Sequence, residues 1–529
     1  MKKRIAAVLI ALSTATVFSA CGDVKTENEG AKATAESTGN EVSDTAEQSG
    51  SSEASSDEVQ SEGNLTNLEV ETETKNVNKK IGNAVLSGKY TQFSLKTEGY
   101  DKLAEALESY SKDRGAEVEK NLASYEDNMA GEDDSQEDYK SNIFYESTSS
   151  AVRADSKVVS ILENVYSYAG GAHPSTWYTT YTYDSKTGEE LKLGDIVNDK
   201  SVLPEILDKE LKKAYPEETF MEPENLKEDI ETIMGYEGEV SEYAEEGAEP
   251  QRGLTFTLGN NGLTFYFSNY EIAPYAAGCQ QVTLTFDEYP DLVKDEYKEH
   301  SENYITKFND SIILENNEEL KVDVSTSDDY DNEYTISVGD KSIKCQIYGF
   351  SNDNYLVHNG GKDYLYIQAC EDNDYRHINI FSLDGNPEML LATDLYFAFD
   401  YYPSDPANMR LCTHYDILST YEGSRKYHVN DAGIPMADSD YDLIDSDVVL
   451  TLKKNLKAEV RNSAEDEKGE EETVSAGTKL SFYATNGTYV DLVTDDGRYV
   501  RVYPSTEGYP RIVDGQNEED VFDGLMYAG

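Results

Sequence analysis

Residue types that mark many catalytic and metal-binding proteins are scarce in this chain of 529 residues, which has six histidines, five cysteines and one tryptophan. No two histidines stand in an HxxxH or HExxH arrangement, and the GxSxG turn of serine hydrolases is absent. The Asp- and Asn-rich runs lack the order of a calcium-binding EF-hand loop. We therefore predict that the chain is not an enzyme and that it holds neither a metal ion nor another cofactor.

Basic residues are also few. Lysine and arginine together number 45 against 104 acidic residues, and the formal net charge is −59. A surface of this sign repels nucleic acid and anionic lipid, so neither is an expected partner. It favours a cationic partner, such as a basic lysozyme, although a generally acidic set of secreted proteins would also explain the composition.

The cysteines indicate no metal site. Four of them lie too far apart for a compact zinc motif: Cys279, Cys345, Cys370 and Cys412. Outside the cytoplasm they could pair in three ways, yet Cys345 and Cys370 stand in apolar contexts typical of buried thiols. Both the paired and the free state stay open.

The only long apolar run stands near the N-terminus. Lys2, Lys3 and Arg4 precede an apolar stretch over 5–18, which is too short for a permanent membrane helix, and Cys21 follows two small residues. This order is typical of a bacterial lipoprotein signal, with an ordinary secretory signal as the alternative. We expect a signal peptide over 1–21, lipidation of Cys21, and an extracytoplasmic protein whose lipid anchors it to the bacterial cell membrane.

The next segment contains few apolar residues. Residues 22–67 are mainly Ser, Thr, Glu, Gly and Ala and contain no aromatic residue. Such a composition buries too little apolar surface to offset the entropy of ordering. We predict a disordered acidic linker.

The most informative stretch runs from 160 to 195. A period of two from Trp177 to Tyr183 predicts a half-buried strand, with Trp177, Thr179, Tyr181 and Tyr183 on one face and Tyr178, Thr180 and Thr182 on the other. Gly170 and Gly171 precede Pro174 and indicate a sharp corner that presents His173, with Tyr168 just before it. His173 could act as a general base beside Asp184 or Asp195, but a histidine that caps backbone groups is the interpretation we prefer.

A second loop follows a predicted hairpin over 254–267, and its aromatic residues are Tyr270 and Tyr275. The loop is either a recognition loop or a proline-fixed crossover that packs its tyrosines inward. The candidate ligand-binding residues are those of the two loops and the adjoining strand: Tyr168, Gly170, Gly171, His173, Trp177, Tyr270 and Tyr275.

The remaining patterns predict the domain organisation. Helical spacing occurs over 103–125, 203–215 and 226–234, between segments with strand patterns, and indicates an α+β fold in which helices cover an antiparallel sheet over 68–305. Short strand patterns with Asp, Asn and Gly turns follow over 306–445, a β-rich region. Residues 446–529 resemble a small bacterial SH3-like β-barrel through their strand spacing and the segment AGTKL.

The chain contains the motif YAGGAHP, followed by YDSKTGEELKLGD, and later the segment GLTFYFSNYEIAPYAAG over 262–278. Together these motifs resemble the PdaC-type extracytoplasmic module and its partner domain of unknown function. The resemblance covers about 68–292. Such modules occur in the lysozyme-sensing anti-sigma factor RsiV, beside a peptidoglycan deacetylase, and in bacterial lipoproteins. The resemblance implies a location in the cell envelope and lysozyme binding, and it does not imply catalysis.

Two functions follow as hypotheses. The first is a cell-surface lipoprotein with a non-catalytic recognition module that binds lysozyme or another cationic wall-active protein. The alternative is a structural lipoprotein associated with peptidoglycan through its sheet and its SH3-like end.

Overall fold

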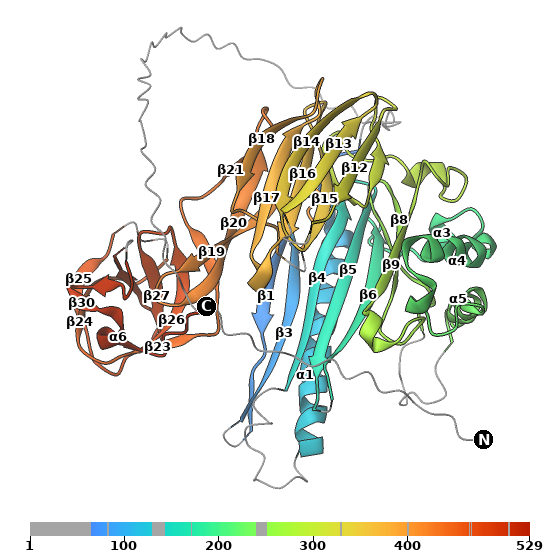
Figure 1. Ribbon diagram of the computed structural model, residues 1–529. Helices are drawn as coiled ribbons and strands as arrows, with labels where there is room; N and C mark the ends of the chain where they lie inside the picture. The colour runs from blue at the N-terminus through green and yellow to red at the C-terminus, as the bar shows by residue number, and fades with distance from the viewer. Residues whose placement is uncertain are drawn as a thin grey trace, which may run out of the picture. The chain divides into compact units, whose positions relative to one another are not determined.

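The computed structural model describes residues 65–81, 84–129, 143–170, 172–239, 251–327, 331–398, 401–464, 466, 468–505 and 508–528 (Figure 1). The predicted signal peptide, Cys21, nearly all of the predicted linker and Gly171 lie outside the described residues. Residues from Glu62 to Gly529 cluster as one compact unit.

The first sheet contains the motif-bearing strands. Its members are β1 (Val70–Asn76), β2 (Lys79–Ile81), β3 (Ala84–Leu95), β4 (Phe144–Ala154), β5 (Val158–Tyr168) and β6 (Ser175–Asp184). The order is β1-β3-β4-β5-β6, with β2 on β3, and only the β3–β4 pair is parallel. A parallel pair needs a long crossover, and helix α1 (Asp101–Met129) lies in it.

Helix α1 packs one apolar stripe against this sheet (Figure 1). The stripe has helical spacing and consists of Leu103, Leu107, Tyr110, Val118 and Leu122, all buried. Gly115 does not break the helix. A Cβ at Gly115 would lie 2.9 Å from the ring of Tyr90 on β3, so glycine permits the close approach of helix and strand.

A second layer of helices and strands packs on β5 and β6 of the first sheet. It contains α3 (Leu193–Ile196), α4 (Leu203–Ala214), α5 (Leu226–Gly235) and the sheet β7-β8-β9 (Thr255–Leu258, Gly262–Phe267, Gln280–Thr285). Side chains of the first sheet bind the edge of β7: the Phe256 amide donates to Thr180 Oγ1 at 3.1 Å, and the Leu258 amide donates to Ser160 Oγ at 3.0 Å. These bonds fix the second sheet on β5 and β6.

The middle of the chain forms two antiparallel sheets that share one apolar core. The first has the order β10 (Tyr304–Phe308), β15 (Ser351–Asn359), β16 (Lys362–Cys370), β17 (Arg376–Ser382) and β18 (Glu388–Thr393). The second has the order β11 (Ser311–Ile313), β12 (Glu319–Ser325), β13 (Asp331–Val338) and β14 (Lys341–Tyr348). Tyr334 pairs with Cys345 in the β13–β14 hairpin.

The C-terminal part is also made of strands. Its large sheet contains β19 (Met409–Asp416), β20 (Thr420–Val429), β21 (Pro435–Ala437), β22 (Asp442–Asp445), β23 (Val449–Leu452), β24 (Leu456–Arg461), β25 (Glu470–Val474), β26 (Lys479–Thr485), β27 (Val490–Thr494), β28 (Tyr499–Val502) and β31 (Phe522–Asp523). A small ladder, β29 (Ile512–Val513) with β30 (Gln516–Asn517), and the short α6 (Glu518–Val521) complete it. Because β22 pairs with β26, this sheet runs across the predicted boundary at 445/446.

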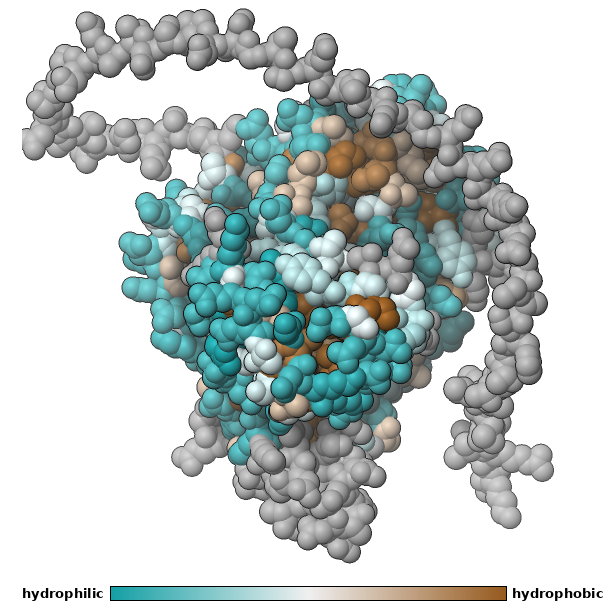
Figure 2. Space-filling model, turned by 90° about the vertical axis from the view of Figure 1, so that its left-hand side faces the viewer, coloured by the Kyte–Doolittle hydropathy of each residue, from teal (hydrophilic) through white to brown (hydrophobic). Residues whose placement is uncertain are grey.

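Figure 2 shows the face on the side of these C-terminal strands, where hydrophilic side chains cover most of the surface and apolar ones gather in a few patches. No helix in the described part of the chain has both the length and the apolar character needed to cross a bilayer.

The prediction of an α+β fold with a helix-covered sheet was wrong. Strands make up 47% and helices 17% of the structure, which is therefore mostly β, with many sheets and few helices. The helical patterns over 103–125, 203–215 and 226–234 do correspond to α1, α4 and α5. From β10 onward the described chain adds one α-helix of four residues, so strands outweigh the helices of the N-terminal part.

Candidate functional site

The two loops singled out in the sequence meet in space. The corner over 169–174 joins β5 to β6, and the loop over 268–279 joins β8 to β9. The two connections are held together behind the surface, because the Tyr178 amide donates to Ser268 Oγ at 3.1 Å. The Cys279 thiol lies 3.8 Å from the Thr176 carbonyl oxygen and 3.7 Å from Asn269 Oδ1.

His173 forms the contact between the loops. Its imidazole stacks on the ring of Tyr275, with 3.7 Å between ring centres and 22° between ring planes. Its Nε2 lies 3.4 Å from the Tyr270 hydroxyl, and its Nδ1 lies 2.9 Å from the carbonyl oxygen of Pro174. We call these three side chains, His173, Tyr270 and Tyr275, the His-Tyr surface.

The backbone of the second loop is unusual at Tyr270, whose φ is +68°. A left-handed conformation is costly for a bulky side chain, and such residues gather at functional sites. The Tyr270 amide donates to the Ala273 carbonyl at 3.2 Å, and the Ser268 amide donates to the Glu271 carboxylate at 2.6 Å. These bonds close the turn that places the Tyr270 side chain outside.

The loop does not pack its tyrosines into the core. Tyr270 is 55% exposed, His173 is exposed and Tyr275 is partly buried, whereas Ile272 and Ala273 are the buried residues of this loop. Of the two interpretations of the loop, the inward-packed tyrosines are therefore wrong. A cluster of exposed aromatic rings with hydroxyl and imidazole groups has the composition of a protein-recognition surface.

Two other candidate residues, Trp177 and Tyr168, lie near aromatic rings that are not part of the His-Tyr surface. Trp177 packs against the ring of Tyr145 with 5.9 Å between ring centres, and it belongs to the core beneath α1. Tyr168 lies near Phe144, at 6.2 Å between ring centres. Gly170 adopts a φ of +92°, which explains a glycine at the corner.

Within the described part of the chain, His173 makes hydrogen-bond contacts with Pro174 and Tyr270 and with no carboxylate that could orient it as a base. Asp184 is at the opposite end of β6, and nine residues of extended strand span about 30 Å. The carboxylate of Asp184 accepts the amides of Lys186 and Thr187, and Asp195 accepts the amide of Lys192. Both aspartates therefore stabilise turns.

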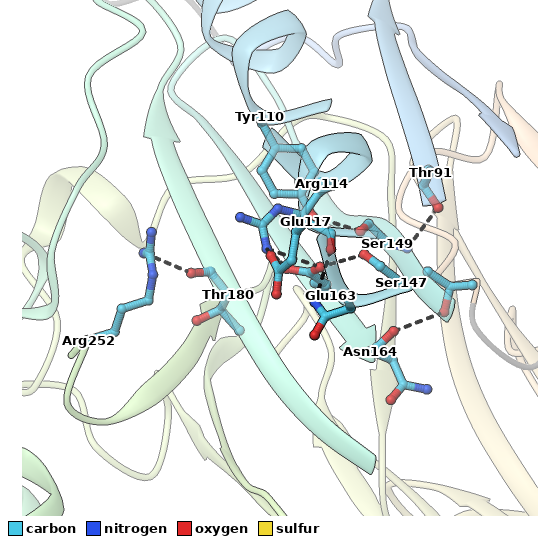
Figure 3. A network of polar contacts seen from close by, with 12 residues as sticks. Thr91, Tyr110, Arg114, Glu117, Ser147, Ser149, Glu163, Asn164, Thr180 and Arg252 are labelled. Carbon is cyan, nitrogen blue, oxygen red and sulfur yellow. Dashed lines mark hydrogen bonds and ion pairs between the residues drawn. The ribbon is translucent and has the colours of Figure 1, made fainter. Parts of the chain in front are cut away.

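A buried polar network beneath α1 was not expected from the sequence (Figure 3). Glu163 on β5 is fully buried and lies 3.4 Å from the guanidinium of Arg114 on α1. The Ser147 hydroxyl donates to Glu163 at 2.5 Å, and Arg114 also pairs with Glu117. Burial raises the pKa of Glu163, although Arg114 and Ser147 oppose this effect.

The network lies inside the protein rather than at a surface. Tyr110 and Ser149 share a hydrogen bond of 2.7 Å, and Ser149 donates its amide to Thr91 Oγ1 at 2.9 Å. Both residues are buried. The network therefore fixes α1 on the sheet, and a charged residue between apolar neighbours, as in Ile161-Leu162-Glu163, is the signal that could have revealed it.

Neither metal ligands nor disulfides occur in the described part of the chain. No group of three or more His, Cys, Asp and Glu side chains there could hold an ion. The four described cysteines are free, and burial raises the pKa of the Cys412 thiol to about 12. The sequence left open whether these cysteines pair, and in this structure the four are free thiols.

Comparisons with known proteins find a family match for one segment of the chain. Residues 194–287 match the model of a protein family of unknown function, DUF3298. A search of curated proteins found no match. Two solved DUF3298 structures, from Bacteroides fragilis and Pseudomonas aeruginosa, are 18% and 16% identical to this chain. Each covers 44% of this chain, with 98% and 96% of its own length covered, and each has a TM-score of 0.29.

The matched segment runs from α3 to β9 and includes Tyr270 and Tyr275, whereas His173 precedes it. The His-Tyr surface therefore joins the matched segment to the sheet before it. Residues 194–287 of this chain are a DUF3298 domain.

Proposed function

We propose that this protein is a non-catalytic binding protein of the bacterial cell surface that captures lysozyme or another cationic wall-active protein through the His-Tyr surface. The observation that carries the proposal is the stacking of His173 on Tyr275 beside the exposed Tyr270, which joins two loops into one surface. We also propose that the module is more specifically of the PdaC type, as in RsiV.

The charge of the chain supports a cationic partner. A net charge of −59 creates a field that accelerates encounter with a basic protein and weakens as salt is added. Affinity at physiological salt then has to come from short-range contacts. Tyrosine supplies such contacts at low entropic cost, since it offers an apolar ring and a hydroxyl on two rotatable bonds.

The location is part of the same proposal. The order of basic, apolar and small residues before Cys21 supports an exported lipoprotein, and the residues after it supply a tether. A lipid-anchored binding module would meet lysozyme at the cell surface.

Surface variants test the proposal. Replacing Tyr270 and Tyr275 together with serine removes both rings, and Tyr503→Ser is the matched control because Tyr503 is 57% exposed and directly follows β28 of the C-terminal sheet. We expect the double variant to weaken binding of immobilised lysozyme about tenfold or more at physiological salt, and Tyr503→Ser to leave it unchanged. Equal binding by all three proteins would contradict the proposal, and retention on purified cell wall without lysozyme binding would favour the structural alternative.

A further inference from the structure

Two neighbouring cavities lie between strands β4–β9 and the middle sheets that begin with β10. Their volumes are about 440 Å³ and about 340 Å³, within the usual range of ligand sites. They share four wall residues, Gln281, Lys307, Tyr355 and Tyr402, and so lie side by side. We call the two together the inter-sheet groove.

Hydroxyl groups dominate one wall of the inter-sheet groove. Thr264 on β8 and Thr283 on β9 share a hydrogen bond of 2.9 Å, and Thr257 and the Tyr266 hydroxyl share one of 3.1 Å. A hydroxyl both donates and accepts, so each of these groups has further capacity toward a ligand. A row of such groups matches a ligand that is itself rich in hydroxyls.

The charged residues of the larger cavity cancel one another. Lys307 pairs with Asp353 at 2.7 Å, and Arg376 pairs with Asp374 at 2.6 Å. These four are the only charged side chains among its lining residues. In a chain with a net charge of −59, such a local balance does not select a cation. In the larger cavity it favours an uncharged ligand. The smaller cavity also carries Glu210, Lys213, Glu288 and Asp310, and there Lys213 pairs with Glu210 at 3.2 Å and with Glu288 at 3.5 Å.

Tyrosine rings form further wall surface. Tyr178 and Tyr266 lie 5.3 Å apart between ring centres, and Tyr402 lies 5.8 Å from the Lys307 ammonium group. Burial raises the pKa of Tyr266 to about 12 and raises those of Tyr355 and Tyr402 well above the ordinary tyrosine value, so these hydroxyls stay protonated donors at neutral pH. An apolar ring with a polar tip suits a sugar, which has apolar C–H faces and hydroxyl edges.

We propose that the inter-sheet groove binds a segment of an uncharged oligosaccharide. The edge of β9 is not open to a peptide added as a strand at Gln281, because the Tyr215 hydroxyl lies there at 3.1 Å from both the amide and the carbonyl oxygen of Gln281. The groove is separate from the His-Tyr surface in the residues that line it, so this proposal does not depend on lysozyme capture.

Isosteric variants test the groove. Thr264→Val and Thr283→Val each remove one hydroxyl and keep the shape of the side chain, and Thr451→Val on β23 is the matched half-buried control. The full-length chain would be titrated calorimetrically with chitotetraose, cellotetraose and maltotetraose. We expect saturable binding of at least one sugar, weakened about fivefold by each groove variant and unchanged in Thr451→Val.

Thermal melting of each variant shows whether it is folded, and Tyr178→Leu gives a second probe from another wall of the groove. Weakened binding in Tyr178→Leu as well would support the proposal. Absence of binding by all three sugars, or binding that no groove variant weakens, would overturn it. Stronger binding of an unstructured neutral peptide than of any sugar would overturn it too.

Discussion

The imidazole of His173 stacks on the ring of Tyr275 with 3.7 Å between ring centres, although 101 positions separate the two residues in the sequence. This contact joins the corner before β6 to the loop before β9. The two loops are therefore one surface, and the stacked pair is its centre.

The stacked pair should stabilise both loops. His173→Ala removes the stacking, whereas His173→Phe keeps a ring on Tyr275 and loses the contacts of the two ring nitrogens with the Tyr270 hydroxyl and the Pro174 carbonyl. Stacked rings contribute about 0.5–1.5 kcal/mol. We expect faster amide hydrogen exchange at Tyr270 and Ala277 in His173→Ala than in His173→Phe, with the Gly259 amide of the distant β7–β8 turn as internal control. Equal exchange in the two variants would contradict a stabilising stack.

The buried Glu163 should make stability fall as pH rises. Its pKa is raised in the folded state, so the folded protein holds the proton more tightly than the unfolded chain does. This contribution is complete below the ordinary glutamate pKa and is lost as pH rises through the folded value. We expect Glu163→Gln to gain stability relative to the parent protein as pH increases above about 4.5 in denaturant titrations.

Glu190 provides the contrasting control for that experiment. Burial opposes its ionisation, but hydrogen bonds from Lys192 and Arg252 outweigh burial and lower the pKa of Glu190. Its contribution is present above the ordinary pKa and is lost as pH falls through the folded value. Glu190→Gln should therefore lose stability relative to the parent protein as pH rises toward neutrality. The same sign of slope for both variants would refute this assignment of the two carboxylates.

Asp155 should be among the most sensitive positions of the fold. The Arg153–Asp155 ion pair of 2.6 Å is buried, and Arg153 Nη1 also donates to the Tyr297 carbonyl at 2.8 Å. Asp155→Ala leaves the guanidinium buried without its charge partner, which costs about 3–5 kcal/mol. Urea unfolding should show this loss, and Glu108→Ala, which removes an exposed ion pair with Lys112, should show none. A small effect at Asp155 would mean that solvent reaches Arg153.

Gly188 should tolerate no side chain, because its φ is +66° and a Cβ there would overlap the Lys102 carbonyl group at the start of α1. Gly497, with φ of +81° and open space around it, is the matched control. Gly497→Ala should lose only the strain of a left-handed residue, about 1–2 kcal/mol. We expect Gly188→Ala to lose clearly more in urea unfolding, and equal losses would contradict the close contact between this turn and α1.

Local patterns predicted the elements of this fold better than its class. The alternation over 254–267 identified β7 and β8, and the spacing from Leu103 to Leu122 identified α1. The class was misjudged because helical stripes in the first module are long and conspicuous, whereas the strands after Tyr304 are short and numerous. Sheet order, such as β22 beside β26, depends on long-range pairing that no local pattern contains.

The candidate site was predicted in part. The glycines before His173 and the loop around Tyr270 were identifiable from turn chemistry, but their contact depends on hydrogen bonds between sheets, such as Leu258 to Ser160. Trp177 packs against the core beneath α1, and its alternation pattern could not indicate this, because strand alternation does not say which face a helix will cover. The inter-sheet groove combines residues as distant as Thr148 and Tyr402, so only the folded chain reveals it.

Calorimetric titration of the full-length chain with lysozyme, at low and at physiological salt, tests the central claim most directly. Saturable one-to-one binding that persists at physiological salt is the predicted result, because the His-Tyr surface would then add short-range contacts to the long-range attraction. Heat that vanishes when salt is added would mean charge attraction alone, and it would contradict a specific lysozyme-binding surface.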